Sequence, residues 1–213
     1  DASESALYDS PFAHVLVNVK PLRDANKGAS RAQRWWLHGE TRPGLRKAGD
    51  GLSRWIVTSE TAKHRYFVWL PQGVAPEHKL VVFPRADDVM FGLLSSRLHN
   101  LWAVATGGRL GVGNDPVYST SKCFLPFPFP AGLTPADTAH QRTETTLPDG
   151  ALIPADLLPA VRTHALPIAR AAKRLVTLRD AWLNPPEWTE RVPEVVPLGM
   201  TASPYPDRIV CKP

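Results

Sequence analysis

Proline is the feature of this sequence that most limits its fold. The chain has 22 prolines in 213 residues, about twice the usual frequency of roughly 5%. Because proline has a fixed φ and no amide hydrogen, it interrupts helices and central strands. We therefore expect many turns between short regular elements, in an α+β fold with a mixed twisted sheet, packed helices, a helical C-terminal extension and an extended proline-rich tail.

The middle of the chain predicts a sheet followed by a helix. Three segments rich in Ile, Val, Tyr, Phe and Trp are expected to form consecutive strands: residues 54–59, 64–70 and 79–83. Asp87 is placed to cap a helix whose apolar positions, Leu98 and Leu101 among them, follow 3.6-residue spacing as far as Trp102. Gly107 is placed to end this helix. This helix is expected to pack on the sheet.

The ends of the chain are less regular. Apolar alternation within residues 9–27 predicts a short strand and a loop, and two short helical stretches follow, near residues 30–37 and 45–48. Residues 134–149 are polar and without a period, which suggests a linker. A helix is expected from Pro154, with a break allowed at Pro167, and the proline-rich tail should run extended.

The second helical segment also predicts a buried stripe. Its members are expected to be Ile168, Ala172, Leu175, Leu178 and Trp182. We expect two parts in the whole chain: a domain at residues 1–150, and a helical extension with its tail at residues 151–213.

Charge and composition exclude several classes of protein. The net charge is +5, with 16 Lys and Arg against 11 Asp and Glu in residues 1–130 and 9 against 9 in residues 131–213. A basic surplus on one part of the chain suits a polyanionic partner such as DNA. No apolar run is long enough for a membrane span, and Cys123 and Cys211 have no zinc-ligand spacing. We expect a cytoplasmic protein without membrane contact.

Two motifs resemble catalytic sites but lack the required context. Asn184, Pro185 and Pro186 are similar to the Asn-Pro-Pro-aromatic signature of amino-methyltransferases, yet Glu187 occupies the aromatic position and the triplet follows a helix. The glycine-rich segment around Gly111 also follows a helix, whereas a nucleotide cradle connects a strand to a helix. We interpret these motifs as a helix stop and as a connecting or recognition loop.

The remaining polar clusters do not predict a catalytic or metal site. Asp87, Asp88 and His99 are explained as helix-capping residues and a helix-surface histidine. His64 could serve as a general base, but no serine or cysteine nucleophile stands in a recognisable arrangement with it. We therefore predict no catalytic residue, no metal site and no bound cofactor in this chain.

Four strings carry a family resemblance when they are taken in order. They are RWWLHGETRPGL (34–45), SRWIVTSETAKHRYFVWL (53–70), ADDVMFGLLSSRLHNLWA (86–103) and PVYSTSKCFLPFPFP (116–130). This region resembles the target-recognition domain of MmeI-like restriction-modification enzymes and related DNA adenine-N6 methyltransferases. The segments RLVTLRDAWLNPPEW (174–188) and YPDRIV (205–210) are similar to the helical part that follows that domain.

The resemblance implies a role in a larger protein. Members of the family join this region to an S-adenosylmethionine-dependent methyltransferase domain and, in some cases, to a nuclease. By analogy, this chain is expected to bind double-stranded DNA and to read its sequence, while the cofactor binds elsewhere in the same polypeptide. The alternative is a protein-interaction module that docks on the methyltransferase domain without reading DNA.

The resemblance also implies individual contacts. The family's base-reading positions correspond to Gly113, Asp115 and Val117, of which Asp115 can accept a hydrogen bond from the N4 amino group of cytosine. Contacts to the DNA backbone are expected from a set of cations: Lys63, Arg65, Arg109 and Lys122. Three aromatic residues are assigned to packing and not to base stacking: Phe124, Phe127 and Phe129.

Overall fold

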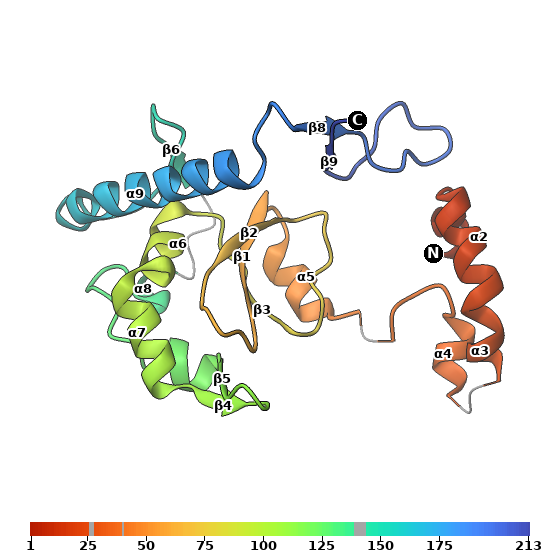
Figure 1. Ribbon diagram of the computed structural model, residues 1–213, viewed down its shortest axis with the longest axis horizontal. Coiled ribbons are helices and arrows are strands. Elements are labelled where there is room, and N and C mark those ends of the chain that lie inside the picture. Colours follow the sequence, from red (N-terminus) through yellow and green to blue (C-terminus); the bar gives the residue numbers. More distant parts are fainter. Residues whose placement is uncertain (26–27, 40, 139–143) are drawn as a thin grey trace. The chain divides into compact units, whose positions relative to one another are not determined.

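The computed structural model describes residues 1–25, 28–39, 41–138 and 144–213, which form two compact units (Figure 1). The terminal unit comprises residues 1–47 and 186–213, and the central unit comprises residues 48–185. The expected boundary near residue 150 falls inside the central unit and stays a prediction. Helices and antiparallel strands together confirm the α+β class.

The central unit is built around a three-stranded sheet in the order β2-β1-β3. Its elements, beginning with the helix that joins the two units, are α5 (Pro43–Gly49), β1 (Arg54–Ser59), β2 (Val68–Pro71), β3 (Leu80–Phe83), α6 (Asp88–Ser95), α7 (Arg97–Thr106), β4 (Gly108–Leu110), β5 (Asp115–Val117), the π-helical turn η1 (Thr120–Phe124), α8 (Pro135–Thr138), β6 (Glu144–Thr146), β7 (Leu152–Pro154) and α9 (Pro159–Leu183).

The strands pair differently from the expected mixed sheet. Every strand pair in the described residues is antiparallel: β1 with β2 and β3, β4 with β5, β6 with β7, and β8 (Thr189–Val192) with β9 (Arg208–Cys211). The link between β1 and β2, residues 60–67, is too short for the crossover of about a dozen residues that parallel neighbours need. The predicted strand 64–70 begins only at Val68, because the Thr58 hydroxyl binds the Tyr66 carbonyl at 2.8 Å and holds the preceding residues in a loop.

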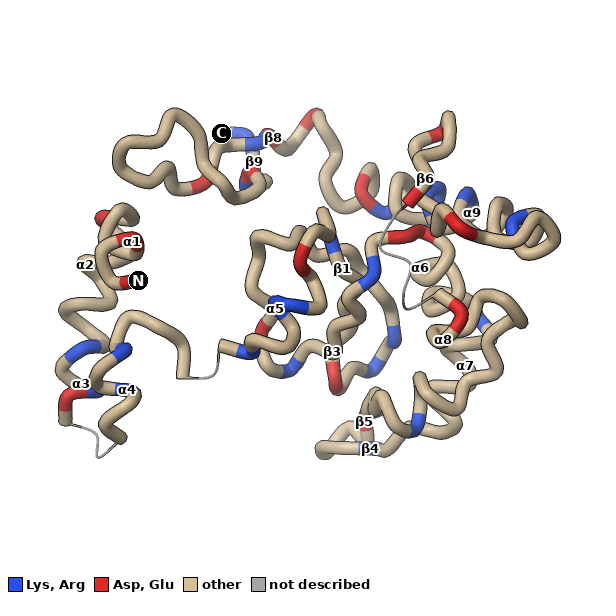
Figure 2. Tube along the Cα trace, turned by 180° about the vertical axis from the view of Figure 1, so that it is seen from behind, with Lys and Arg blue, Asp and Glu red and all other residues tan. Residues whose placement is uncertain are grey.

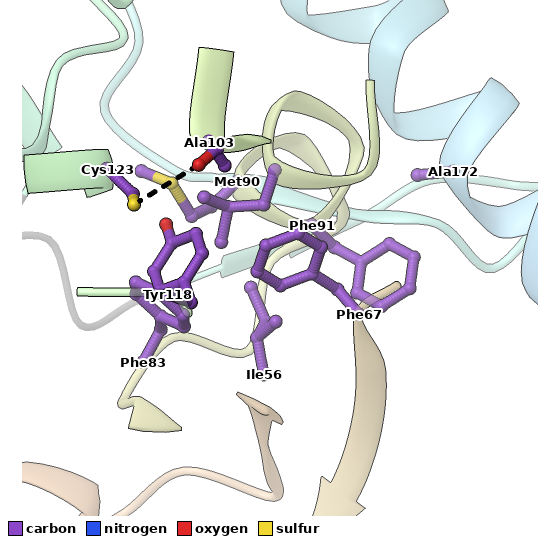
Figure 3. Close-up of a cluster of buried hydrophobic side chains, with 10 residues drawn as sticks. Ile56, Phe67, Phe83, Met90, Phe91, Ala103, Tyr118, Cys123 and Ala172 are labelled. Carbon is purple, nitrogen blue, oxygen red and sulfur yellow. Dashed lines mark hydrogen bonds between the residues drawn. The ribbon is translucent and has the colours of Figure 1, made fainter. Parts of the chain in front are cut away.

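An apolar core joins the sheet to the helices that cover it (Figure 3). Ile56, Phe67 and Phe91 have no exposed surface. The indole of Trp69 stacks on the Phe91 ring with centroids 4.7 Å apart. The core therefore fixes α6 against β1 and β2, and the predicted packing of the helix on the sheet is confirmed.

The expected long helix is in fact two helices. Asp87 caps α6 as predicted, with its carboxylate accepting from the Met90 amide at 2.8 Å. Ser96 then leaves the helical conformation and caps α7, accepting from the His99 amide at 3.1 Å. This break changes the inward face of the helix, so Leu98 and Leu101, predicted as apolar stripe positions, are exposed.

Helix α9 runs unbroken from Pro159 to Leu183, with Pro167 on its exposed side. It packs closely against α6 through the buried residues Ala165, Ala169 and Ala172. The predicted stripe is therefore wrong in its second half: Leu175, Leu178 and Trp182 are exposed. Close helix packing selects small side chains. The buried face of α9 therefore carries alanines, while the larger apolar side chains lie on its exposed face.

The terminal unit contains helices where a strand was expected. Its elements are α1 (Ala2–Ala6), α2 (Asp9–Asn18), α3 (Lys20–Asp24), α4 (Ala29–Gln33), β8 (Thr189–Val192) and β9 (Arg208–Cys211). The half-buried positions Tyr8, Phe12, Val15 and Val19 have helical spacing, and the Phe12 ring contacts Trp35 with centroids 5.2 Å apart. Burial follows this period and not the alternation at residues 14–19, so the predicted strand is wrong.

The tail folds back on itself and on the N-terminal helices. Strands β8 and β9 form an antiparallel hairpin, which corrects the expectation of a fully extended tail. The Leu198 amide donates to the Leu7 carbonyl at 2.8 Å, and the Tyr8 and Tyr205 rings lie 5.9 Å apart.

In the part of the chain that is described, no helix combines the length and the apolar character that crossing a membrane requires.

Candidate nucleic-acid interface

A short β-hairpin after α7 presents the predicted base-reading residues. Strands β4 and β5 are connected by the turn from Gly111 to Asn114, in which the Asn114 amide donates to the Gly111 carbonyl at 3.0 Å. Gly111 and Asn114 have φ values of +78° and +52°, which glycine and asparagine tolerate best. The glycine-rich segment is therefore a hairpin turn that follows a helix.

Gly107 allows the chain to turn from α7 into this hairpin. A Cβ atom there would clash with the Val117 carbonyl oxygen and would lie 2.6 Å from the Ala103 carbonyl oxygen. Both neighbours are backbone atoms, so only glycine fits without displacing an element.

The hairpin is anchored to the loop that follows β1. The Tyr118 amide donates to the Glu60 carbonyl at 2.7 Å, and the Ala62 amide donates to the Pro116 carbonyl at 3.2 Å. Thr61 and Val117 form an isolated antiparallel bridge. These contacts bring residues from two distant parts of the sequence to one place.

A surface hollow of about 340 Å³ lies where the loop and the hairpin meet. Its lining includes four of the predicted site residues, and the full set is Lys63, Val104, Arg109, Gly113, Asn114, Asp115 and Pro116. The hollow therefore brings the Asp115 carboxylate together with two cations and the Asn114 side chain. Such a combination of groups can form hydrogen bonds to base edges and ion pairs with phosphates.

The three predicted base readers do not occupy equivalent positions. Asp115 and Val117 project on the same face of β5, because they are two residues apart in a strand. Gly113 lies in the turn, where a Cβ atom would come within 3.3 Å of an Asp115 carboxylate oxygen. The absence of a side chain at Gly113 leaves room for the carboxylate.

Arg65 lies close to this site but is largely occupied by protein contacts. Its guanidinium donates to Thr58 Oγ1 at 3.1 Å, to the Ser59 carbonyl, to the Glu60 carbonyl at 3.3 Å and to the Pro116 carbonyl at 3.1 Å. Burial lowers the pKa of this guanidinium. These contacts give Arg65 a structural role, and its expected contact with phosphate stays a prediction.

The other predicted cations are accessible. Lys63, Arg109 and Lys122 are exposed, and none forms an ion pair with a carboxylate in the described residues. Lys122 lies in η1 and is not part of the hollow. Figure 2 marks further cations along α9, so the positive charge of the central unit is not confined to the hairpin.

The polar residues considered as metal ligands have structural roles. Asp87 is a helix cap, as predicted, whereas Asp88 is buried and pairs with Arg54 at 3.0 Å while accepting from the Leu152 amide at 2.7 Å. Burial raises the pKa of Asp88. The described residues contain no group of three His, Cys, Asp or Glu side chains placed to hold a metal ion.

His99 was predicted on the helix surface, and that prediction is wrong. The side chain has no exposed surface, and Nε2 lies 2.9 Å from the Tyr118 hydroxyl. Burial lowers the pKa of His99 to about 4, so the ring is neutral near pH 7. Its place in the core follows from the helix break at Ser96, which the apolar periodicity did not reveal.

The assignment of the three phenylalanines to packing is confirmed. The Phe124 ring lies 4.9 Å from Phe83, and Phe127 lies 4.5 Å from the His99 ring in an edge-to-face arrangement. Phe129 contacts both Phe124 and Phe127, at 5.3 and 4.9 Å. All three rings are half-buried and pack on aromatic residues of the central unit.

Sequence reasoning missed three residues at the tip of the hairpin. Asn114 lines the hollow, and Leu110 and Val112 are exposed beside it. The signal for Asn114 was available in the Gly-Asn-Asp-Pro turn composition. The pairing of Leu110 with Asp115 depends on the register of β4 and β5, and these strands are too short for the sequence to predict it.

Comparison with known proteins defines the class of this chain as a target recognition domain, since residues 3–131 match a family model of that kind. The chain belongs to the family described as MmeI, target recognition domain.

A search of the solved structures also finds MmeI, a Type IIL restriction-modification enzyme determined in complex with DNA, at 21% identity and a TM-score of 0.39. The match covers 55% of this chain and 15% of that chain. None of the curated proteins matches.

Proposed function

We propose that this chain reads a duplex DNA sequence through the β4–β5 hairpin. The observation that carries the proposal is the placement of Asp115 with Lys63 and Arg109 around one hollow in a chain of the MmeI target recognition family. MmeI itself was determined with DNA bound. Asp115 accepts from the N4 amino group of cytosine, while the two cations contact phosphates.

The physical fit is with the major groove. A two-stranded ribbon has strands about 4.8 Å apart and side chains on both faces, and the major groove, about 12 Å wide, admits such a ribbon. The cytosine N4 donor is also presented in the major groove. Gly113 and Val117 assist by leaving the carboxylate free and by fixing the strand against Thr61.

The longer protein in this proposal is a cytoplasmic DNA methyltransferase. S-adenosylmethionine binds to its methyltransferase domain and not to this chain, and that domain is the second partner of the chain beside double-stranded DNA. Titration of the 213-residue chain with S-adenosylmethionine should give no binding heat, and micromolar binding would contradict this division of roles.

The competing function is docking on the methyltransferase domain without reading DNA. The observation that favours it is the apolar face of α9, where Leu178 and Trp182 are 59% and 80% exposed. The two functions differ in one measurable property, because only the first requires the chain to select a DNA sequence.

Selection from a library of random duplexes tests the proposal. The chain should enrich one sequence motif, and Asp115→Ala should relax one cytosine position by roughly 5- to 150-fold while leaving the other positions strict. Glu190→Ala removes a similar charge from the exposed hairpin of the terminal unit and serves as the matched control. Absence of any enriched motif would sink the reading function and favour docking.

A further inference from the structure

The tip of the β4–β5 hairpin exposes two apolar side chains that the packing of the protein does not explain. Leu110 is 59% exposed and Val112 is fully exposed. Turn positions are dominated by Gly, Pro, Asn, Asp and Ser, so valine is an unusual residue at this one. Single exposed apolar residues are common on protein surfaces, so the position of these two must carry the argument.

The strand register places Leu110 next to the proposed base reader. Leu110 is the direct cross-strand partner of Asp115. Opposite residues in an antiparallel pair project on the same face, with Cβ atoms about 5 Å apart. An isobutyl group and a carboxylate therefore stand side by side on the face that carries Asp115.

This spacing matches neighbouring bases in a duplex. Successive bases along a strand are about 3.4 Å apart, so side chains about 5 Å apart can contact adjacent base pairs. The major groove offers one apolar group to such a side chain, the 5-methyl group of thymine. Lys63 and Arg109 line the same hollow as Asp115, so they are placed to contact the phosphates on either side of these bases.

We propose that Leu110 contacts the 5-methyl group of a thymine in the major groove, at the base pair next to the one that Asp115 reads. This inference rests on the proposed function and adds a specificity-determining residue to it. Val112 extends the apolar surface beyond the end of the strand, where it excludes water from the contact.

The experiment uses the full 213-residue chain and the duplex that it selects from a random library. Each thymine of that duplex is replaced in turn by deoxyuridine, which removes only the methyl group. At one thymine, binding by the wild-type chain should weaken about 3- to 5-fold, the effect of losing one buried methyl group. Leu110→Ala should lose that discrimination between thymine and deoxyuridine.

Leu178→Ala is the matched control, because Leu178 is also 59% exposed but lies on α9. It should retain the wild-type response to deoxyuridine. The inference fails if no thymine methyl group matters, if the motif contains no thymine, or if Leu110→Ala still discriminates. If the inference fails but Asp115→Ala still relaxes the selected motif, the proposed function stands without the role of Leu110. If the chain selects no motif, the proposed function is overturned as well.

Discussion

At the scale of single residues, burial decides the chemistry of the charged and titratable side chains of the central unit. Arg65 donates to four oxygen atoms, and His99 is enclosed by aromatic rings next to the Tyr118 hydroxyl. Neither environment could be read from the local sequence, because both depend on contacts between elements. Asp87 was predictable, since its capping role depends only on the residues of the first helical turn.

His99 makes the stability of the protein dependent on pH. Its pKa is about 4 in the folded chain and about 6.5 when exposed. The folded state thus binds fewer protons between these values, so stability is full above pH 6.5 and falls as the pH drops towards 4. Urea unfolding should show a loss of roughly 2 kcal/mol between pH 7 and pH 5.

The control for this prediction is His99→Phe, which keeps an aromatic ring in the cluster. The variant loses the hydrogen bond to Tyr118 and should be less stable at pH 7, but its stability should change much less over the same pH range. Equal pH dependence in both proteins would assign the effect to other groups.

Replacement of Arg65 should lower the stability of the protein much more than replacement of Lys63. Arg65→Lys keeps the charge but cannot reproduce the planar set of donors that contacts Thr58, Glu60 and Pro116. We expect it to lower the unfolding free energy by about 1 to 3 kcal/mol. Lys63→Ala should change stability by less than about 0.5 kcal/mol. Urea denaturation of both variants measures the difference, and equal effects would contradict the structural role of Arg65.

At the scale of elements, the packing of α9 on α6 depends on small residues. A Cβ atom at Gly92 would lie 2.7 Å from Ile168 Cγ2, 3.1 Å from the Ile168 carbonyl oxygen and 3.3 Å from Ala172 Cβ. Alanine favours a helix over glycine by about 1 kcal/mol, but here the clash opposes this gain. Because one of these neighbours is a backbone atom of α9, the two helices must move apart to relieve the clash.

Gly92→Ala should therefore destabilise the protein by about 1 to 3 kcal/mol, as overpacked cores do. Gly44→Ala is the matched control, because Gly44 is also helical and a Cβ atom added there would have no neighbour within 4 Å. It should be neutral or slightly stabilising. Thermal unfolding followed by circular dichroism measures both variants, and a stable Gly92→Ala variant would show that the helix interface is loosely packed.

Sequence patterns predicted the elements with one strong period and failed where two signals competed. Strand β1 and the capped start of α6 follow directly from apolar runs and Asp87. Helix α2 was missed because its valines favour a strand, while its burial follows the contact with Trp35. The face of α9 was misplaced because alanine packs closely but contributes little to a hydrophobic stripe.

At the scale of the whole molecule, the terminal unit is formed by two segments that lie far apart in the sequence. Residues 186–213 join residues 1–47 in the terminal unit, which no local pattern indicates. The candidate site shows the same dependence, since the loop at Lys63 reaches the hairpin through the bridge between Thr61 and Val117. The resemblance indicated which residues to consider, and their roles stay predictions, whereas the hollow that four of them share required the tertiary structure.

The final prediction concerns the charge of the whole interface. When a protein neutralises DNA phosphates, the logarithm of the binding constant falls linearly with the logarithm of the salt concentration. The size of this slope is close to the number of phosphate contacts. If Lys63, Arg109 and Lys122 contact phosphates, their joint replacement by glutamine should reduce that slope by about 3. Replacing Arg162, Lys173 and Arg174 of α9 makes the same change in net charge and should leave most of the slope.

Affinity for one duplex between about 50 and 200 mM salt gives both slopes. If the α9 variant loses more of the slope than the variant of Lys63, Arg109 and Lys122, the phosphate contacts are made by α9, because the number of contacts and not the net charge sets the slope. Equal small losses would instead indicate that binding depends on the overall field of the protein, in which case Asp115 could still select the base but the cations around it would not position the DNA.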